Sequence, residues 1–131
     1  MNKINVGQKA KLSKTISETD VYLFSGISGD FNPIHLNTEY AKDTMFKERI
    51  VQGVLIVGLI SSVIANKLPG PGSILLSQEI KYVAPVKIND TITAIVEITE
   101  ILDEGKVMLK TQCINQRKKL VIDGFAKVKV I

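Results

Sequence analysis

The residue types that could carry out chemistry are concentrated in one short segment, which holds an aspartate and the only histidine of the 131-residue chain. Asp30 and His35 are five residues apart, separated by Phe31-Asn32-Pro33-Ile34. Turn-forming residues between them allow both side chains to project to one side and hold a water molecule. A carboxylate and an imidazole suit general acid/base catalysis near neutral pH, because one accepts a proton while the other gives one. An aspartate after glycine is also a common turn cap, and a lone histidine is often a packed core residue, so spacing alone leaves both interpretations open.

Helices on both sides of this segment are expected to position it. A hydroxyl at Ser17 followed by an acid at Asp20 is a variant capping box, and it predicts a helix that ends near Gly29. Residues 29–37 are rich in Gly, Asp, Asn and Pro, and they predict a structured loop. A short helix over 38–44 is expected to follow.

The longest apolar stretch predicts a central helix over residues 51–67, which ends before the sequence Leu68-Pro69-Gly70-Pro71-Gly72. This stretch is apolar nearly all round, so we expect other elements to wrap the helix on most sides. Its apolar run from Ile50 to Ala65 is interrupted by polar residues and is shorter than the roughly 20 residues needed to cross a bilayer. The sequence therefore indicates a buried helix and no membrane contact.

Apolar residues alternate with polar ones after the central helix, which predicts strands. Short polar separators between them favour antiparallel neighbours. The expected strands are residues 8–16, 73–82, 91–102, 106–115 and 120–130. Together they predict an α+β fold in which one antiparallel sheet curls around one long central helix, the shape of a hot dog fold.

Composition limits the class of protein. A length of 131 residues with 45% hydrophobic and 23% charged residues predicts a single globular domain over residues 1–131. The formal charge of +4 favours anionic partners, but without tryptophan or a clustered basic stripe we expect no nucleic acid. A lone cysteine, Cys113, together with an N-terminus that lacks an apolar run, favours a cytoplasmic protein. One histidine and scattered acids predict neither a metal site nor a cofactor.

The segment from Phe24 to His35, followed by Ala41, closely resembles the hydratase 2 motif of the MaoC-like, (R)-specific enoyl-CoA hydratase family. The similarity extends over essentially the whole chain, including Arg49-Ile50-Val51-Gln52-Gly53 and the strands to the C-terminus. Two positions depart from the pattern, because Gln52 stands where many relatives have histidine and Asn37 where an acid is common. Neither change affects the aspartate and histidine of the motif.

The resemblance implies that Asp30 and His35 activate a water that attacks C3 of an enoyl-CoA and return a proton to C2. Gly53, at the start of the central helix, would offer its N–H to the thioester oxygen, or would simply permit close packing. Asn32 would hold the loop or a polar group of the site, and turn formation alone also explains it. Ser61 matches a substrate-facing position, and a hydroxyl bonded back to the helix is the alternative.

Three other functions use the same fold. A 3-hydroxyacyl-[acyl-carrier-protein] dehydratase would run the reaction in reverse on a carrier protein. A hot dog acyl-CoA thioesterase commonly uses an acid from the central helix, and residues 51–67 contain no Asp or Glu. A non-catalytic acyl-CoA sensor would not need the Asp–His spacing. We also expect a homodimer with the sheets joined edge to edge, because a small curled sheet leaves an edge that soluble proteins cover.

Overall fold

One antiparallel sheet and one long helix make up most of this computed structural model, which describes residues 3–131. The strands are β1 (Lys9–Thr15), β2 (Ser73–Tyr82), β3 (Thr91–Ile101), β4 (Lys106–Ile114) and β5 (Leu120–Val130). The helices are α1 (Glu18–Ser28), α2 (Pro33–Leu36), α3 (Thr38–Lys42) and α4 (Gly53–Asn66). The order in the sheet is β1-β3-β4-β5-β2, and every pair of neighbours is antiparallel. The predicted α+β fold and its strand order along the chain are confirmed.

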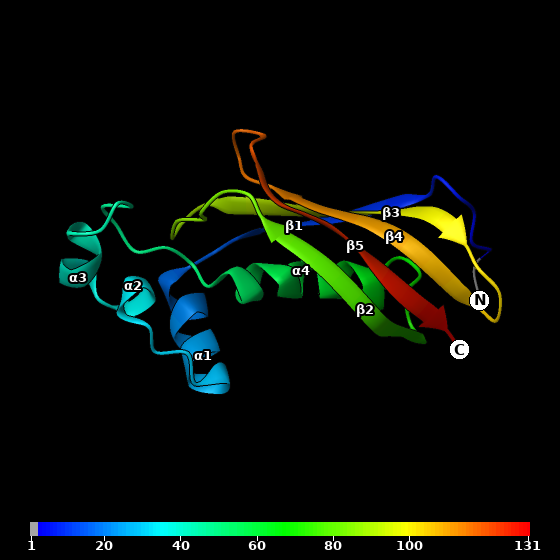
Figure 1. The fold of residues 1–131 in the computed structure, drawn as a ribbon, viewed down its shortest axis with the longest axis horizontal. Coiled ribbons are helices and arrows are strands. Elements are labelled where there is room, and N and C mark those ends of the chain that lie inside the picture. The colour runs from blue at the N-terminus through cyan, green and yellow to red at the C-terminus, as the bar shows by residue number, and fades with distance from the viewer. Residues whose placement is uncertain (1–2) are drawn as a thin grey trace.

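The core lies between the sheet and α4, which runs along the sheet while α1, α2 and α3 gather at one end of the molecule (Figure 1). Every second residue of β3 is buried, from Ile92 through Ala94 and Val96 to Ile98. This period-two pattern turns one face of the strand towards the helix. Ile56 and Ile60 of α4 are also fully buried. Each valine or isoleucine side chain buried in this way stabilises the fold by about 1.5–3 kcal/mol.

One stripe of α4 stays uncovered, so the sheet wraps the helix on its inner side only. Val54, Gly58, Ser61 and Ala65 are exposed, and their spacing places them on one side of the helix. The neighbouring edge strand β2 also exposes large apolar side chains; they are Ile74, Leu75 and Leu76. The apolar surface of the helix and of the sheet edge is therefore left without a partner within residues 3–131.

Local caps explain where the first two helices begin. The Ser17 Oγ accepts from the Asp20 N–H at 3.1 Å and the Asp20 carboxylate accepts from the Ser17 N–H at 2.9 Å, which completes the predicted capping box of α1. Hydrogen bonding to the Ser17 N–H lowers the pKa of the Asp20 carboxyl, which favours the charged form that the box uses. The expectation that residues 29–37 form only a loop is wrong. Asn32 caps a single helical turn and Pro33 occupies its first position, where a missing N–H has no cost, so this part of the segment is α2.

Strands β2 and β5 approach each other very closely at Gly124, which pairs with Ile80. A Cβ atom at Gly124 would lie 2.0 Å from the backbone oxygen of Glu79. Only a residue without a side chain permits this approach, which brings the edge strand β2 onto the sheet.

Candidate active site

His35 lies in α2, with only 8% of its surface exposed. Its Nδ1 is 2.8 Å from the backbone oxygen of Ile50. A carbonyl oxygen can only accept, so Nδ1 carries the proton and Nε2 is the nitrogen with a free lone pair in the neutral ring. The fold thus fixes both the orientation and the tautomer of the imidazole.

Asp30 faces the free nitrogen of His35 from the preceding loop. Its Oδ2 lies 3.7 Å from His35 Nε2, and 41% of its side chain is exposed. The second carboxylate oxygen, Oδ1, accepts from the Asn32 N–H at 3.2 Å, which holds the side chain in place. A separation of 3.7 Å is too long for a direct hydrogen bond but allows one water oxygen to lie within hydrogen-bond distance of both atoms. The structure therefore brings together the two side chains that the motif separates by five residues.

Asn32 connects these two residues through its backbone and its side chain. Its side-chain oxygen accepts from the Ile34 N–H at 3.2 Å, and its backbone oxygen accepts from the His35 N–H at 3.0 Å. These bonds form the helical turn that carries His35. The side-chain oxygen is therefore used as a helix cap, as the turn-forming interpretation expects.

An apolar cavity of about 330 Å³ adjoins the imidazole. His35 and Gly53 contribute to its wall. The remaining lining residues come from the segment before α4, from α4 and from the sheet; they are Ile50, Val51, Val54, Ile56, Tyr82, Ala84, Val86 and Ile122. A mostly apolar pocket with a few polar groups at one end is the usual form of a small-molecule site.

Gly53 is the first residue of α4 and lies on the wall of this cavity. The N–H groups of the first helical turn have no partner inside a helix, and the N-terminus carries the positive end of the dipole. Gln52, the residue in the N-cap position, makes no side-chain bond to these groups. A Cβ at Gly53 would lie 2.5 Å from Cε1 of Tyr82, so close packing also requires a small residue here. Both interpretations of this glycine have a structural basis.

Ser61 is not among the residues that line the cavity. It lies on the exposed stripe of α4, and eight residues of helix place it about 12 Å from Gly53. The structure of one chain therefore does not bring Ser61 to Asp30 and His35.

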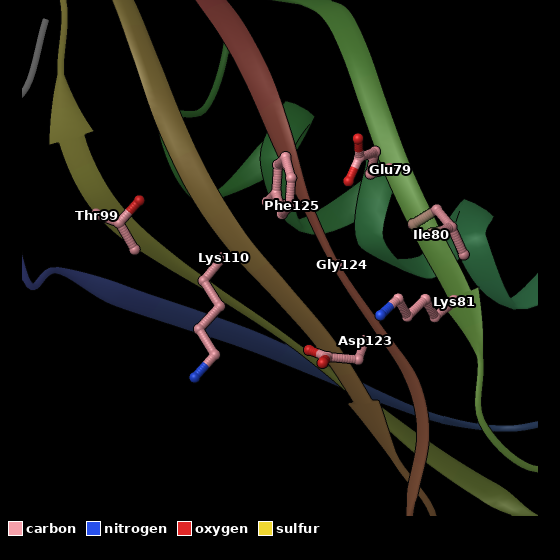
Figure 2. Close-up of a pocket in the computed structure, with 8 residues that line it drawn as sticks. All are labelled: Glu79, Ile80, Lys81, Thr99, Lys110, Asp123, Gly124 and Phe125. Carbon is pink, nitrogen blue, oxygen red and sulfur yellow. The ribbon is translucent and has the colours of Figure 1, made fainter.

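A larger cavity of about 590 Å³ lies on the strands β2, β3, β4 and β5 (Figure 2). Its charged residues are Glu79, Lys81, Lys110 and Asp123. Figure 2 shows these side chains spread along the strands, without convergence on one point. None of them belongs to the motif, so the smaller cavity beside His35 is the candidate active site.

Other titratable residues do not extend this site. Cys113 is buried in the core, and burial raises the pKa of its thiol to about 12, which keeps it neutral and unreactive. Across residues 3–131, His, Cys, Asp and Glu side chains do not gather in groups of three or more that would hold a metal ion. In the same part of the chain, no helix has both the length and the hydropathy that crossing a bilayer requires.

Comparison with known proteins places this fold and motif in a family. The profile of the MaoC-like domain matches residues 2–119. An (R)-specific enoyl-CoA hydratase of Rhodospirillum rubrum is 50% identical over 128 residues, which cover 97% of this chain and 88% of the relative. The chain therefore belongs to the MaoC-like domain family, and the resemblance noted in the sequence is confirmed.

Two solved structures have closely similar folds. An R-hydratase from Pseudomonas aeruginosa, solved in the unliganded form, has a TM-score of 0.93 and 44% identity over 97% of this chain and 82% of its own. The (R)-hydratase from Aeromonas caviae has a TM-score of 0.96 and 39% identity, and the match covers 100% of both chains. The hot dog fold expected from the sequence is therefore confirmed.

Two contributors to the site were missed by sequence reasoning. The Ile50 carbonyl accepts from His35, and backbone groups leave no signal in residue type. Tyr82 ends a strand almost 30 residues after Gly53 and reaches the cavity only because the sheet curls over α4. Its aromatic character was compatible with any strand, so no sequence signal distinguished it.

Proposed function

We propose that this protein is an (R)-specific enoyl-CoA hydratase with Asp30 and His35 as its acid/base pair. The observation that carries the proposal is the 3.7 Å separation of Asp30 Oδ2 and His35 Nε2, together with an apolar cavity whose wall includes His35. The 50% identity to the hydratase of Rhodospirillum rubrum supports the same activity.

The pair acts on a water molecule held between the two side chains. One group removes a proton from the water as its oxygen bonds to C3 of the enoyl thioester, and a proton is returned to C2. The Nδ1–H bond to Ile50 keeps His35 Nε2 directed at this water. Proton loss and proton gain balance, so the reaction needs no redox partner.

Negative charge develops on the thioester oxygen during the attack. We assign its stabilisation to the Gly53 N–H and the positive end of the α4 dipole, which is free because Gln52 makes no side-chain cap. The acyl chain occupies the apolar cavity beside them. Asn32 acts by holding the turn of His35, and Ser61 would meet substrate only across an interface with a second chain.

Purified protein is expected to hydrate crotonyl-CoA to the (R)-alcohol without added metal or nucleotide. The enoyl absorbance would report the rate, and chiral analysis of the product would report the stereochemistry. Formation of the (S)-alcohol would contradict the stereochemical assignment, and unchanged absorbance would contradict the function.

The same assay separates the alternatives. Faster turnover of carrier-protein thioesters than of CoA thioesters would favour the dehydratase of fatty-acid synthesis. Release of free CoA thiol would favour the thioesterase, although α4 of this chain offers no acidic residue between Gly53 and Asn66.

We further propose a cytoplasmic location, where a single unpaired thiol stays reduced. Cell fractionation tests this location.

We also propose a homodimer in which the β2 edges of two chains pair and cover the exposed stripe of α4. Unpaired strand edges and apolar patches are surfaces that soluble proteins normally cover. Both features lie side by side here, on β2 and on the stripe that contains Val54 and Gly58.

Gly58→Arg is expected to convert the dimer into a folded monomer. A Cβ at Gly58 meets nothing within 4 Å in one chain, so a single chain has room for the new side chain. A second chain packed on this stripe would bury the charge, which is costly without a partner. Light scattering and circular dichroism would measure mass and folding, with Thr99→Arg on the outer surface as the control. A parent protein that is monomeric at micromolar concentration would rule out the dimer.

A further inference from the structure

Gln52 has a buried polar side chain that the proposed mechanism does not use. Only 2% of the residue is exposed. Its amide nitrogen donates to the Val21 backbone oxygen at 3.1 Å and contacts the Ser25 Oγ at 3.0 Å, and both residues belong to α1. Its Oε1 atom is buried and has no hydrogen-bond partner among residues 3–131. An unpaired buried oxygen is unfavourable, so stability alone does not explain an amide at this position.

The direction of this side chain is also unusual for its place in the fold. Gln52 is the N-cap residue of α4, and side chains in that position commonly accept hydrogen bonds from the first helical turn. The Gln52 amide instead extends to α1. The N-terminus of α4 therefore has no side-chain cap beside the cavity, and the Gln52 amide connects it to α1 instead.

The backbone on each side of Gln52 holds the reactive groups. The Ile50 oxygen accepts from His35 Nδ1 at 2.8 Å, and the Ile50 N–H donates to the Ile34 oxygen at 3.2 Å. Gly53 follows directly with its N–H at the start of α4. A shift of residues 50–53 would therefore move the imidazole and the Gly53 N–H relative to one another.

A second connection to α1 comes from Arg49, but it lies nearer the solvent. Its guanidinium donates to the Tyr22 hydroxyl at 3.0 Å and pairs with Glu18, whose carboxyl pKa it lowers. The Glu18 side chain is 52% exposed, so solvent and salt weaken this pair. The Gln52 bonds are the part of the connection that is shielded from water.

We infer that Gln52 is a positioning residue for the reaction. Its hydrogen bonds hold residues 50–53 against α1, and this fixes the position of His35 relative to the Gly53 N–H. This inference rests on the proposed hydratase function. Gln52 acts only by positioning other groups, because its side chain does not line the cavity. Displacing catalytic groups by a fraction of an ångström to an ångström is enough to slow an enzyme substantially.

Gln52→Met tests the inference. Methionine is similar in size and flexible, and it removes both the bonds to α1 and the unpaired Oε1, so the melting temperature should change little. We expect kcat for crotonyl-CoA to fall by about 10-fold or more, and KM to stay within about three-fold of the parent. A structural role alone would lower the amount of folded enzyme without this separation of kcat from KM.

Gln112→Met is the matched control. Gln112 is partly buried and donates its amide to Asp123 at 3.2 Å, but it lies in β4 next to inward-facing Thr111 and points away from α4. The same chemical change there should leave kcat within about two-fold. Ser25→Ala removes one partner of the Gln52 amide and should lower kcat in the same direction, even if Gln52→Met does not fold.

The outcomes separate the inference from the proposed function. A parent protein that hydrates no enoyl thioester overturns the proposed function and the inference with it. An active parent overturns the inference alone if folded Gln52→Met keeps kcat within about two-fold, or if Ser25→Ala leaves kcat unchanged where Gln52→Met does not fold. Loss of kcat in Gln112→Met as large as in Gln52→Met would also overturn it.

Discussion

Asp30→Asn is expected to reduce kcat by at least about 10²-fold without lowering the melting temperature, because removal of a general acid or base typically costs about 10²- to 10⁴-fold in rate. The structural role of Asp30 survives the change. Its Oδ1 accepts from the Asn32 N–H, and an asparagine oxygen can accept the same bond. What is lost is the negatively charged Oδ2 beside His35 Nε2. Steady-state kinetics with crotonyl-CoA and thermal unfolding measure the two effects separately.

KM should change much less than kcat, because Asp30 does not line the apolar cavity that we propose as the acyl site. Asn32→Asp serves as a comparison variant that adds a carboxylate two residues from Asp30 while keeping the oxygen that caps α2. Activity of Asp30→Asn within a few-fold of the parent would mean that Asp30 is a turn cap and that the proposed mechanism is wrong.

Gly124→Ala is expected to destabilise the fold by about 3 kcal/mol or more, because overpacking against a backbone is costly and cannot be relieved by rotating a side chain. The added Cβ would lie 2.0 Å from the Glu79 oxygen, so β2 has to move away from β5. A melting temperature lower by roughly 10 °C, or failure to fold, is the expected result.

Gly26→Ala is the matched control for this variant. Gly26 lies inside α1, and a Cβ there meets nothing within 4 Å. The same substitution should therefore stabilise the protein by about 0.5–1 kcal/mol, since alanine favours a helix more than glycine does. Equal melting temperatures for Gly124→Ala and the parent would show that β2 and β5 do not pack as closely as described.

Periodicity was sufficient to predict the long elements. The strands of the sheet and the central helix lie within two residues of their expected bounds, because their apolar residues repeat with the period of the structure that buries them. The short helix α2 was missed because Asn and Pro favour turns and helix starts alike. Its four residues are too few to show a helical period.

The candidate site was predictable only in its side chains. Asp30 and His35 are identified by type and spacing, whereas the Ile50 carbonyl acts through backbone that every residue has. The contact between Gly53 and Tyr82 depends on the curvature of the sheet, which is a property of the assembled strands. Gln52 was noted as a departure from its relatives, but its bonds to α1 could not be foreseen, because they join residues 27 and 31 positions apart.

The site has two parts with separate origins in the fold. The groups that would handle protons, and the backbone that orients them, all lie between Asp30 and Gly53, outside the sheet. Much of the cavity wall comes from Ala84, Val86 and Ile122, which make no side-chain hydrogen bond to Asp30 or His35. Substitutions of Ala84 or Ile122 are expected to change the size and shape of the cavity while leaving the hydrogen bond that orients His35 in place. The shape of the cavity and the position of the Asp30–His35 pair are therefore set largely by different segments of the chain.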